Sequence, residues 1–414
     1  MEVKPGYKQT EVGVIPAEWE VKPLRSVLNK GRLGGNYPNQ DRETEYPLMK
    51  MGNLARGHID TAKIEYITRG VTPERQHKLA NGDVLFNTRN TLDLVGKVAI
   101  WRDELPLAYY NSNLMRLEFD PQQVCSNEYA NAALNTAGAI AVLRGLATGT
   151  TSVAAIYTRD LLGMPLITPP LPEQRAIAGA LSDVDALIGG LDQLIAKKRD
   201  LKQAAMQQLL TGQTRLPGFR GEWAVKKMGE LADMGSGGTP PSSVAAYYDG
   251  DIPWVSISDM TKGGKVILST DRNLTRAGFA NSAAQMFPVG TVLYALYASL
   301  GECSIAGISL CSSQAILGIR SKVNLDKEFL YYFLTSLKPV VKAMGQHGTQ
   351  ANLNKGMVQD FELRLPTLPE QTAIAEVLSD MDAELAALEQ RRDKTRALKQ
   401  GLMQELLTGR TRLR

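Results

Sequence analysis

Two segments of the sequence predict long helices. From residue 173 onward, apolar side chains recur at alternating intervals of four and three residues, the spacing of a helix that buries one face. The apolar positions are Ile177, Leu181, Val184, Ile188, Leu191 and Ile195 in the first segment, and Ile374, Leu378, Met381, Leu385 and Leu388 in the second. The apolar pattern then shifts, resuming at Leu201 and Leu209 and at Leu398, Leu402 and Leu406, which predicts a stutter in each helix. Gly212 and Gly409 are typical residues for ending the two helices.

The two predicted helices are copies of one another. At a shift of 197 residues, 171–216 align with 368–413 without a gap, with 28 identities in 46 positions. Both copies open on Leu-Pro-Glu-Gln and close on Leu-Leu-Thr-Gly-x-Thr-Arg-Leu. Such agreement indicates a duplicated chain with two halves of roughly 200 residues.

The regions between the helices match each other more weakly. Glu18–Lys22 aligns with Glu222–Lys226, Pro47–Met51 with Pro253–Ile257, Gly82–Phe86 with Gly290–Tyr294, and Gly149–Thr151 with Gly348–Gln350. Short Val, Ile, Leu and Tyr runs bounded by Gly, Pro and Asn predict strands, and helices are expected at 126–144 and 326–344. The helices have therefore stayed alike while the regions between them have diverged.

The resulting fold class is α+β, with two mixed α/β domains and a pseudo-twofold internal duplication. We expect the domains at 1–168 and 217–365, and the helical segments at 169–216 and 366–414. Two like helices in one chain can pack as an antiparallel coiled coil, which separates the two domains.

Composition and charge exclude several classes of protein. With 43% hydrophobic and 22% charged residues the chain has an ordinary globular composition, and its net charge of +4 neither proves nor excludes a polyanionic partner. Three cysteines without a CxxC motif, and no signal-peptide or membrane-spanning pattern, favour the reducing cytoplasm. The three histidines are far apart, which disfavours a zinc site, and phosphate-loop, dinucleotide and GxSxG motifs are absent. Any catalysis is thus expected on a partner.

These features together resemble the specificity (S) subunit of a type I restriction-modification enzyme. The resemblance rests on the paired Leu-Pro-Glu-Gln blocks, the Leu-Leu-Thr-Gly-x-Thr-Arg endings, and Gly238-Thr239-Pro240-Pro241 followed by Tyr247-Tyr248 and Gly250–Trp254. The first half departs from it, because Gly34–Pro38 lacks the Gly-Thr-Pro form and Asp83 stands where the second half has Thr291. We expect these departures to affect the DNA sequence that is read.

The resemblance implies a non-catalytic, DNA-reading chain in a host-defence complex. Each domain is implied to be a target recognition domain that reads one half of a bipartite, asymmetric double-stranded DNA sequence. The helices are implied to set the spacer and to dock two modification subunits, which bind S-adenosylmethionine and methylate adenine. Restriction subunits, when present, add ATP- and Mg-dependent translocation and cleavage. This chain is expected to bind no cofactor or metal itself. The candidate partner-binding residues are Glu173, Gln174, Glu370 and Gln371.

Candidate DNA-reading residues are polar side chains in loops that follow apolar strands. Arg, Lys, Asn, Gln, Ser and Thr read base edges, and glycine lets the backbone approach DNA closely. The candidates are Lys50, Asn53, Arg56, Asn87, Thr88, Arg89, Asn90, Thr150 and Thr151 in the first domain, and Ser256, Ser258, Lys262, Tyr297, Ser299, Thr349 and Gln350 in the second. Because no segment is strongly basic, phosphate binding has to come from local patches.

Other residues favour structural roles. Trp19, Trp223 and Trp254 are expected to pack in the core or at hinges. Lys197–Arg199 and Arg391–Arg392 are typical of a solvated helix face, with contact to DNA or a partner as the alternative. Two other classes of protein stay open: a scaffold with two protein-binding domains, and an enzyme with an unusual active site. Within the resemblance, the chain could also serve a fused methyltransferase-nuclease or lack a nuclease partner.

Overall fold

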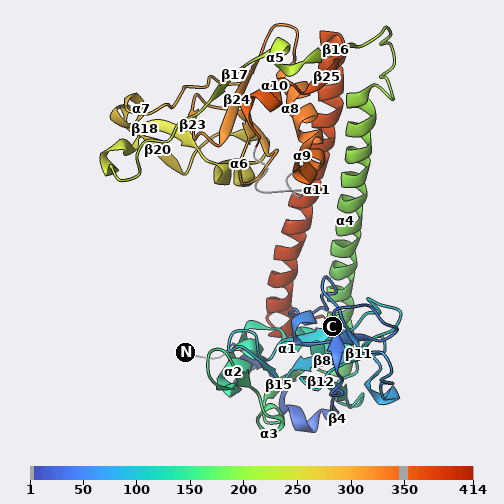
Figure 1. Ribbon diagram of the computed structural model, residues 1–414. Coiled ribbons are helices and arrows are strands. Elements are labelled where there is room, and N and C mark those ends of the chain that lie inside the picture. The colour runs from blue at the N-terminus through green and yellow to red at the C-terminus, as the bar shows by residue number, and fades with distance from the viewer. Residues whose placement is uncertain (1–3, 345–352, 414) are drawn as a thin grey trace. The chain divides into compact units, whose positions relative to one another are not determined.

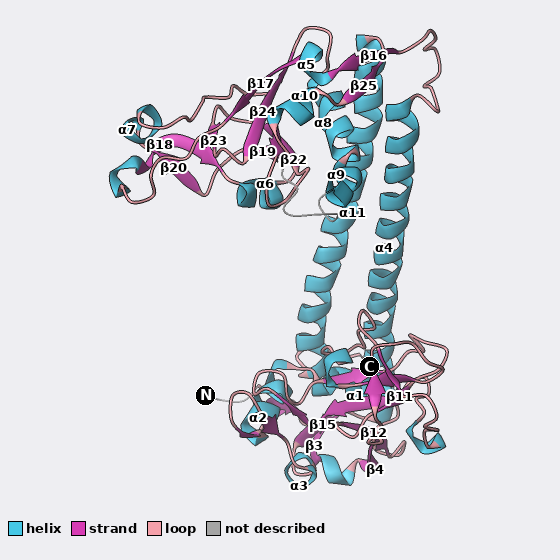
Figure 2. Cartoon of the chain, in the orientation of Figure 1, coloured by secondary structure: helices cyan, strands magenta, loops and turns pink. Residues whose placement is uncertain are grey.

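The computed structural model describes residues 4–344 and 353–413, and the chain divides into two compact units (Figure 1). Unit 1 comprises Met1–Asp192 and Gln390–Arg414, and unit 2 comprises Gln193–Glu389. Each unit contains both helices and strands, as the α+β prediction requires (Figure 2).

Unit 1 is built mainly from two four-stranded sheets. One has the strand order β10-β8-β12-β4 and the other β11-β6-β7-β5, while β13-β14-β9 form a small third sheet and β15 pairs with β3. The elements before the first long helix are β1 (Tyr7–Thr10), β2 (Gly13–Pro16), β3 (Glu20–Pro23), η1 (Leu24–Ser26), β4 (Leu28–Leu33), β5 (Asn39–Gln40), β6 (Pro47–Met49), η2 (Met51–Asn53), β7 (Glu65–Ile67), η3 (Arg75–His77), β8 (Val84–Asn87), β9 (Arg89–Asn90), β10 (Val98–Ile100), β11 (Tyr109–Tyr110), β12 (Leu114–Phe119), α1 (Asn127–Leu134), α2 (Ala137–Leu146), β13 (Thr148–Gly149), β14 (Ala154–Ala155), α3 (Thr158–Leu161) and β15 (Pro165–Thr168).

Unit 2 is organised in the same way. Its largest sheet has the order β17-β24-β21-β22-β19, a second sheet has the order β20-β18-β23, and β16 pairs with β25. Its elements outside the long helices are β16 (Ala224–Lys227), α5 (Met228–Leu231), β17 (Ala232–Ser236), η4 (Ala245–Tyr247), β18 (Tyr248–Val255), α6 (Ile257–Gly263), β19 (Val266–Ile267), β20 (Arg272–Leu274), α7 (Arg276–Ala280), β21 (Val292–Ala295), β22 (Cys303–Ala306), β23 (Cys311–Ser312), β24 (Ile316–Ser321), α8 (Lys327–Ser336), α9 (Lys338–Met344), α10 (Lys355–Gln359) and β25 (Glu362–Leu365).

Equivalent strands pair alike in the two units. β6 runs parallel to β11 with Met49 opposite Tyr110, and β18 runs parallel to β23 with Val255 opposite Ser312. The central strands β8 and β21 are buried along their whole length, because they lie between neighbouring strands and consist of apolar, β-branched or aromatic residues apart from Asn87 at the end of β8. Gly82 and Gly290, which precede them, both have positive φ angles of 86° and 87°. The weak sequence similarity between the two regions thus reflects a shared framework.

The helices expected at 126–144 and 326–344 each form as two shorter helices. α1 ends at Leu134, and Thr136 then caps α2 by accepting a hydrogen bond from the Ala139 amide. α8 ends at Ser336, and α9 begins at Lys338, next to Pro339. A proline restricts the residue before it and removes one helical hydrogen bond, so an uninterrupted helix is disfavoured there.

The two long helices are α4 (Leu171–Thr211) and α11 (Leu368–Leu407). Their N-terminal parts are buried in apolar cores through Ile177 and Leu181 in unit 1 and through Ile374 and Leu378 in unit 2. The predicted stutter is wrong, since Leu201 and Leu398 are 47% and 72% exposed.

The inner face of each helix instead continues through polar positions. It follows 3-4-3-4 steps from Ile195 to Leu209 and from Arg392 to Leu406. The intermediate positions are Lys198, Lys202 and Ala205 in α4 and Thr395, Lys399 and Leu402 in α11. Lysine stems pack against apolar surface while the charged ends reach a partner. Because lysines occupy this part of the inner face, the apolar pattern alone predicts the wrong residues there.

Within each unit the two helix segments lie side by side in opposite directions, linked by equivalent ion pairs. In unit 1, Lys399 pairs with Asp185 at 2.5 Å and Arg396 with Asp192 at 2.9 Å. In unit 2, the corresponding pairs are Lys202 with Asp382 and Arg199 with Glu389. These pairs fix the alignment of the segments, although exposed ion pairs contribute only about 0–1 kcal/mol each.

Candidate nucleic-acid interface

A small sheet in unit 1 brings together two of the predicted DNA-reading loops. β14 pairs with β9, placing Ala154 opposite Asn90 and Ala155 opposite Arg89, and β13 pairs with the other edge of β14. Leu92 N donates to the Thr151 carbonyl at 3.2 Å. Residues 87–90 and 149–152, about sixty positions apart in sequence, are therefore neighbours. We call residues 88–94 and 148–157 the recognition finger.

The finger exposes a mixture of cationic, hydroxyl and apolar groups. Arg89, Thr150 and Thr151 are exposed, and so are Val153 and Tyr157, at 67% and 58%. Exposed apolar groups beside an arginine and hydroxyls suit the floor of a DNA groove, where thymine methyls and base edges lie together.

The turn of the finger requires a glycine. Gly149 has φ +131°, and a Cβ there lies 2.3 Å from the Val153 carbonyl oxygen. Any side chain at this position strains the backbone and pushes the two strands apart.

Two of the predicted DNA-reading residues are buried and form hydrogen bonds that hold loops in place. Asn87 is fully buried, and its side-chain oxygen accepts from Arg89 N at 3.2 Å. Asn53 is 6% exposed and donates to the carbonyls of Asp60 and Lys63. Because these amides are buried and bonded to backbone, we correct both from base-reading to loop-positioning residues.

The other first-domain candidates keep some accessibility. Thr88 is half-buried and donates to the Asn113 carbonyl at 2.8 Å, and Asn90 accepts from Thr91 N at 2.9 Å. Lys50 pairs with Glu65 at 2.8 Å. Arg56 is half-buried, forms no ion pair with any described carboxylate, and has one shielded guanidinium nitrogen, Nη1.

In unit 2 the candidates fall into two groups. Ser256 caps α6, and its hydroxyl donates a hydrogen bond to Asp259 at 2.7 Å. That hydroxyl proton is therefore already engaged within the domain. Ser258 and Lys262 are exposed, and Lys262 pairs with Asp271 at 3.0 Å.

The second group aligns in sequence with the recognition finger. Tyr297 and Ser299 are half-buried, close to the point where Leu353 N donates to the Leu296 carbonyl at 3.1 Å. Thr349 and Gln350 lie outside the described residues.

The residues predicted to bind a partner have internal roles. Glu173 and Glu370 are 5% and 1% exposed, and Gln174 and Gln371 are fully buried. Gln174 donates to the Gln123 and Pro169 carbonyls, and Gln371 to the equivalent Asn324 and Pro366 carbonyls. Side chains enclosed in this way cannot contact another subunit, so this prediction is withdrawn.

Each of these glutamates forms the centre of a junction cluster. In the first junction cluster, Trp19 Nε1 donates to Glu173 at 2.9 Å, and Arg412 binds the same carboxylate through Nε and Nη2 at 2.6 and 2.7 Å. The second junction cluster repeats this with Trp223, Glu370 and Arg215, at 3.2, 2.5 and 2.8 Å. In both, the guanidinium also lies over the indole ring. The burial of Trp19 and Trp254 agrees with the predicted packing role of the tryptophans.

Arg144, which was not among the predicted residues, is exposed in the last turn of α2. Its charge acts on Arg56, because burial and, after it, the charge of Arg144 lower the pKa of the Arg56 guanidinium below its ordinary value. A cation near a helix C-terminus is common for dipole reasons alone, so the sequence carried no signal for this residue.

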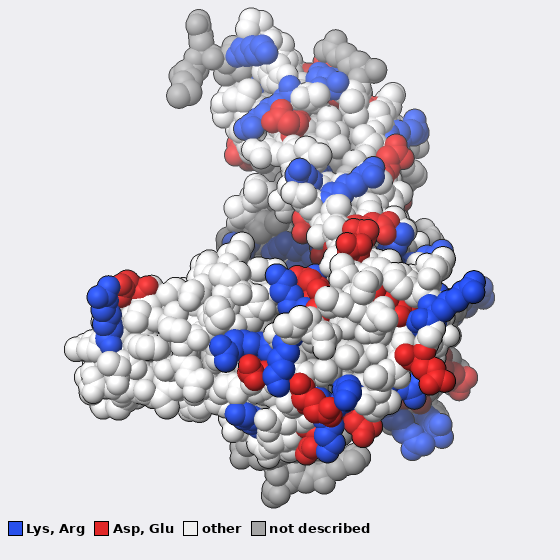
Figure 3. Space-filling view, turned by 90° about the horizontal axis from the view of Figure 1, so that it is seen from above, with Lys and Arg blue, Asp and Glu red and all other residues white. Residues whose placement is uncertain are grey.

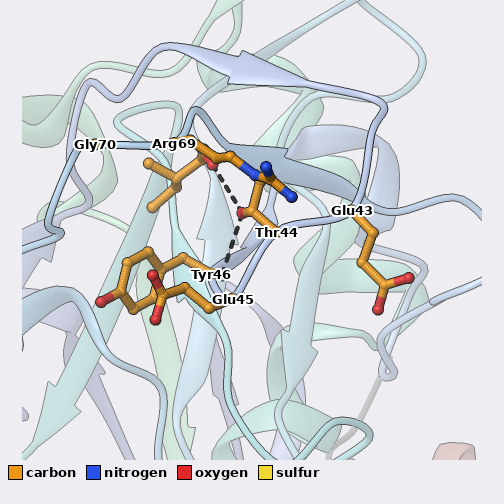
Figure 4. A pocket seen from close by; sticks show the side chains of 7 residues that line it. Glu43, Thr44, Glu45, Tyr46, Arg69 and Gly70 are labelled. Carbon is orange, nitrogen blue, oxygen red and sulfur yellow. Dashed lines mark hydrogen bonds between the residues drawn. The ribbon is translucent and has the colours of Figure 1, made fainter.

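One surface pocket of unit 1 has acidic as well as basic side chains in its lining, which includes Arg69. The pocket in Figure 4 is lined by Glu43 and Glu45, whose carboxylates repel phosphate, and by Thr44, which bridges Tyr46 N and the Ile67 carbonyl. Lys and Arg are interspersed with Asp and Glu on the face in Figure 3, in agreement with local rather than global basic patches.

The described residues contain no cluster of three or more His, Cys, Asp or Glu that could hold a metal. None of the helices within those residues has both the length and the apolar character needed to span a bilayer.

The type I restriction modification DNA specificity domain matches the sequence twice, at residues 16–197 and 220–396. The chain belongs to this family. It is accordingly a DNA-recognition subunit of a type I restriction-modification system, the class to which its curated relatives are assigned.

Relatives cover the chain from end to end. The putative type I restriction enzyme MjaX specificity subunit of Methanocaldococcus jannaschii is 25% identical over 422 residues, covering 99% of this chain and 97% of the relative. The MjaVIII specificity subunit of the same organism is 22% identical, covering 97% and 94%. The crystal structure of the type I restriction-modification S subunit from M. genitalium shares the fold, with a TM-score of 0.57, 14% identity and 98% coverage of both chains.

Proposed function

We propose that the two domains each read one half of a bipartite, asymmetric DNA target. The observation that supports this most is the contrast between the units, which share strand pairing and junction clusters but present different side chains in corresponding loops. An asymmetric target needs two unlike readers on a common framework. In unit 1 the reading groups are Arg89, Thr150 and Thr151 of the recognition finger.

We propose further that α4 and α11 form an antiparallel coiled coil that sets the spacer between the half-sites. At 1.5 Å per residue, a helix of 41 residues is about 60 Å long. Half-sites on one face of DNA lie about one helical turn, near 34 Å, apart, so the helices are long enough for this role. The equivalent ion pairs support the antiparallel arrangement.

The chain acts within a larger complex and has no catalytic role of its own in this proposal. Two modification subunits dock on the helices, bind S-adenosylmethionine and methylate adenine. Restriction subunits, where present, use ATP and Mg for translocation and cleavage. The docking surface is the exposed side of the helices, since Glu173, Gln174, Glu370 and Gln371 are buried.

The experiment is an exchange of residues 12–168 for the corresponding region of a relative, followed by sequencing of methylated adenines in cells that also express the modification subunit. One half of the methylated motif is expected to change while the other half stays. The matched control exchanges 217–365, which should change only the other half. A change in both halves, or in neither, contradicts the proposal and favours a protein-binding scaffold.

A further inference from the structure

One face of the recognition finger points away from the core of unit 1. In the pairing of β14 with its two neighbours, Ala155 lies opposite Arg89 of β9 and opposite Thr148 of β13. Directly opposed residues of an antiparallel pair have their side chains on the same face. Arg89 and Thr148 are exposed and Ala155 is half-buried, so these three residues belong to the outer face of the finger.

Two large apolar side chains continue this outer face. Side chains alternate between the two faces of an extended strand. Val153 and Tyr157 are 67% and 58% exposed, whereas the residues between them, Ala154 and Ile156, are 1% and 2% exposed and belong to the core of unit 1. A slip by one residue would expose Ala154 and Ile156. The buried residues therefore hold the two apolar side chains on the outside.

The backbone at Val153 is fixed by the turn of the finger. Thr150 N donates to the Val153 carbonyl at 2.9 Å, and Val153 N donates to Thr150 Oγ1 at 3.2 Å. The neighbouring guanidinium of Arg89 is accessible, and it has no ion pair and no hydrogen bond within the described residues. An exposed valine and an unpaired arginine are thus presented together on a rigid hairpin.

The spacing on this face suits the edges of stacked base pairs. By the register of β14 and β9, Val153 and Tyr157 are the two diagonal neighbours of Arg89. Diagonal neighbours are about 7–8 Å apart, or about two base-pair steps of roughly 3.4 Å. Arginine binds the edge of guanine in the major groove, and apolar side chains contact the methyl group of thymine there.

The size of the finger favours a DNA groove over a protein surface. The hairpin of β13 and β14 spans eight residues, 148–155, whereas a specific protein interface has about 20–30 residues a side. The major groove admits a two-stranded β-ribbon, and thymine methyl groups are exposed there. The chain also belongs to a family of DNA specificity domains.

We propose that Val153 and Tyr157 are specificity-determining residues that contact the 5-methyl groups of thymines, on either side of the base pair that Arg89 contacts. This inference rests on the proposed function, because it names the chemical group that the same DNA-reading domain recognises. Cytosine has no methyl group at this position, so the contact distinguishes one pyrimidine from the other. The contact is uncharged and acts on base choice, not on the salt dependence of binding.

The test measures DNA binding by the full chain assembled with its modification subunits. The duplexes carry the methylated motif, and in the half that depends on residues 12–168 each thymine is replaced in turn by deoxyuridine, which lacks only the methyl group. The wild-type complex is expected to bind about fourfold more weakly at two of these positions, the effect of about 0.8 kcal/mol for one buried methyl group.

The variants show whether the protein side chain and the DNA methyl group touch each other. Val153→Ala should weaken binding to the thymine duplex and should bind the thymine and deoxyuridine duplexes equally well at one of the sensitive positions, because a contact already lost is not lost again. Tyr157→Ala should do the same at the other position. The slope of log K against log salt should not change in either variant.

Val14→Ala is the matched control, since Val14 is a 45% exposed valine of β2 in the same unit but outside the finger. It should keep the fourfold preference for thymine at both positions. All three side chains are exposed, so the variants are expected to fold.

The outcomes separate this inference from the proposed function. If the wild-type complex shows no specific, salt-dependent binding, the proposed function fails. If it binds specifically but no deoxyuridine substitution weakens binding, the thymine assignment alone is overturned. It is also overturned if Val153→Ala and Tyr157→Ala weaken binding to thymine and deoxyuridine duplexes equally at every position, which is the result of a purely structural role.

Discussion

The two junction clusters are nearly identical, whereas the candidate DNA-reading loops of the two units are not. Trp19, Glu173 and Arg412 in unit 1 repeat the bonds of Trp223, Glu370 and Arg215 in unit 2. In the sequence alignment of the two units, Pro47–Met51 corresponds to Pro253–Ile257, a shift of 206 residues. At the same shift, Arg56 corresponds to Lys262. Lys262 pairs with Asp271, while Arg56 has no described carboxylate partner.

This difference separates two kinds of constraint on the chain. The junctions hold buried charges, which are tolerated only when each partner is present and correctly oriented. The reading surfaces are exposed, so their side chains can change with little loss of stability. A duplicated framework can therefore keep its junctions while the exposed loops of its two domains diverge.

The largest effect is expected from breaking a junction cluster. Arg412→Met leaves the carboxylate of Glu173 buried without its partner, which should lower the free energy of unfolding by about 3–5 kcal/mol. Arg215→Met should act in the same way on Glu370 in unit 2. Hydrogen exchange resolves the two, because Arg412→Met should loosen unit 1 first and Arg215→Met unit 2.

The control for this prediction removes the buried charge as well. In Glu173→Gln combined with Arg412→Met, part of the lost stability should return, since no carboxylate remains unpaired. Equal exchange rates in wild type and Arg412→Met would show that the junction does not hold the unit together.

An intermediate effect is expected along the long helices. Leu191→Ala removes a 5% exposed side chain and should cost about 2–4 kcal/mol, while Leu201→Ala, at 47% exposure, should cost less than about 0.5 kcal/mol. Urea denaturation measures both. If both variants lost a similar amount of stability, Leu201 would lie on the buried face, as the stutter predicted from the sequence requires. The continuous inner face through Lys198 and Lys202 would then be wrong.

The smallest effect is a pH dependence confined to unit 1. His77 is buried and hydrogen-bonded to Tyr37 at 2.6 Å, and burial lowers its pKa below the ordinary value of 6.5. Because the unfolded chain then binds a proton more readily than the folded one, stability is present above pH 6.5 and declines as the pH falls below it. Unfolding at pH 7.5 and pH 5.5 measures the decline.

The exposed His58 provides the comparison for His77. His77→Gln should flatten the pH dependence of unit 1, and His58→Gln should leave it unchanged. A decline that persists in His77→Gln would assign it to other groups.

The sequence by itself determined the duplication, the two long helices and the family. These follow from local spacing and from repeated motifs, because apolar residues at 4-3 intervals and a gapless repeat need no knowledge of distant contacts. It also pointed to residues 87–90 and 149–152 as candidate loops. It failed at Leu201 and Leu398, because apolar character alone does not say which face of a helix a residue occupies when lysines share the inner face.

The tertiary structure decided which of the candidate residues are accessible and which lie together. Asn and Glu are usually found at the surface, but Asn87 and Glu173 are buried in this protein. The side chain of Asn87 accepts from the Arg89 amide, and that of Glu173 accepts from Arg412, which is distant in sequence. Arg89 and Ala155 are 66 positions apart and become neighbours only because β9 pairs with β14. Burial and charge proximity depend on such long-range packing, and a linear pattern contains no record of it.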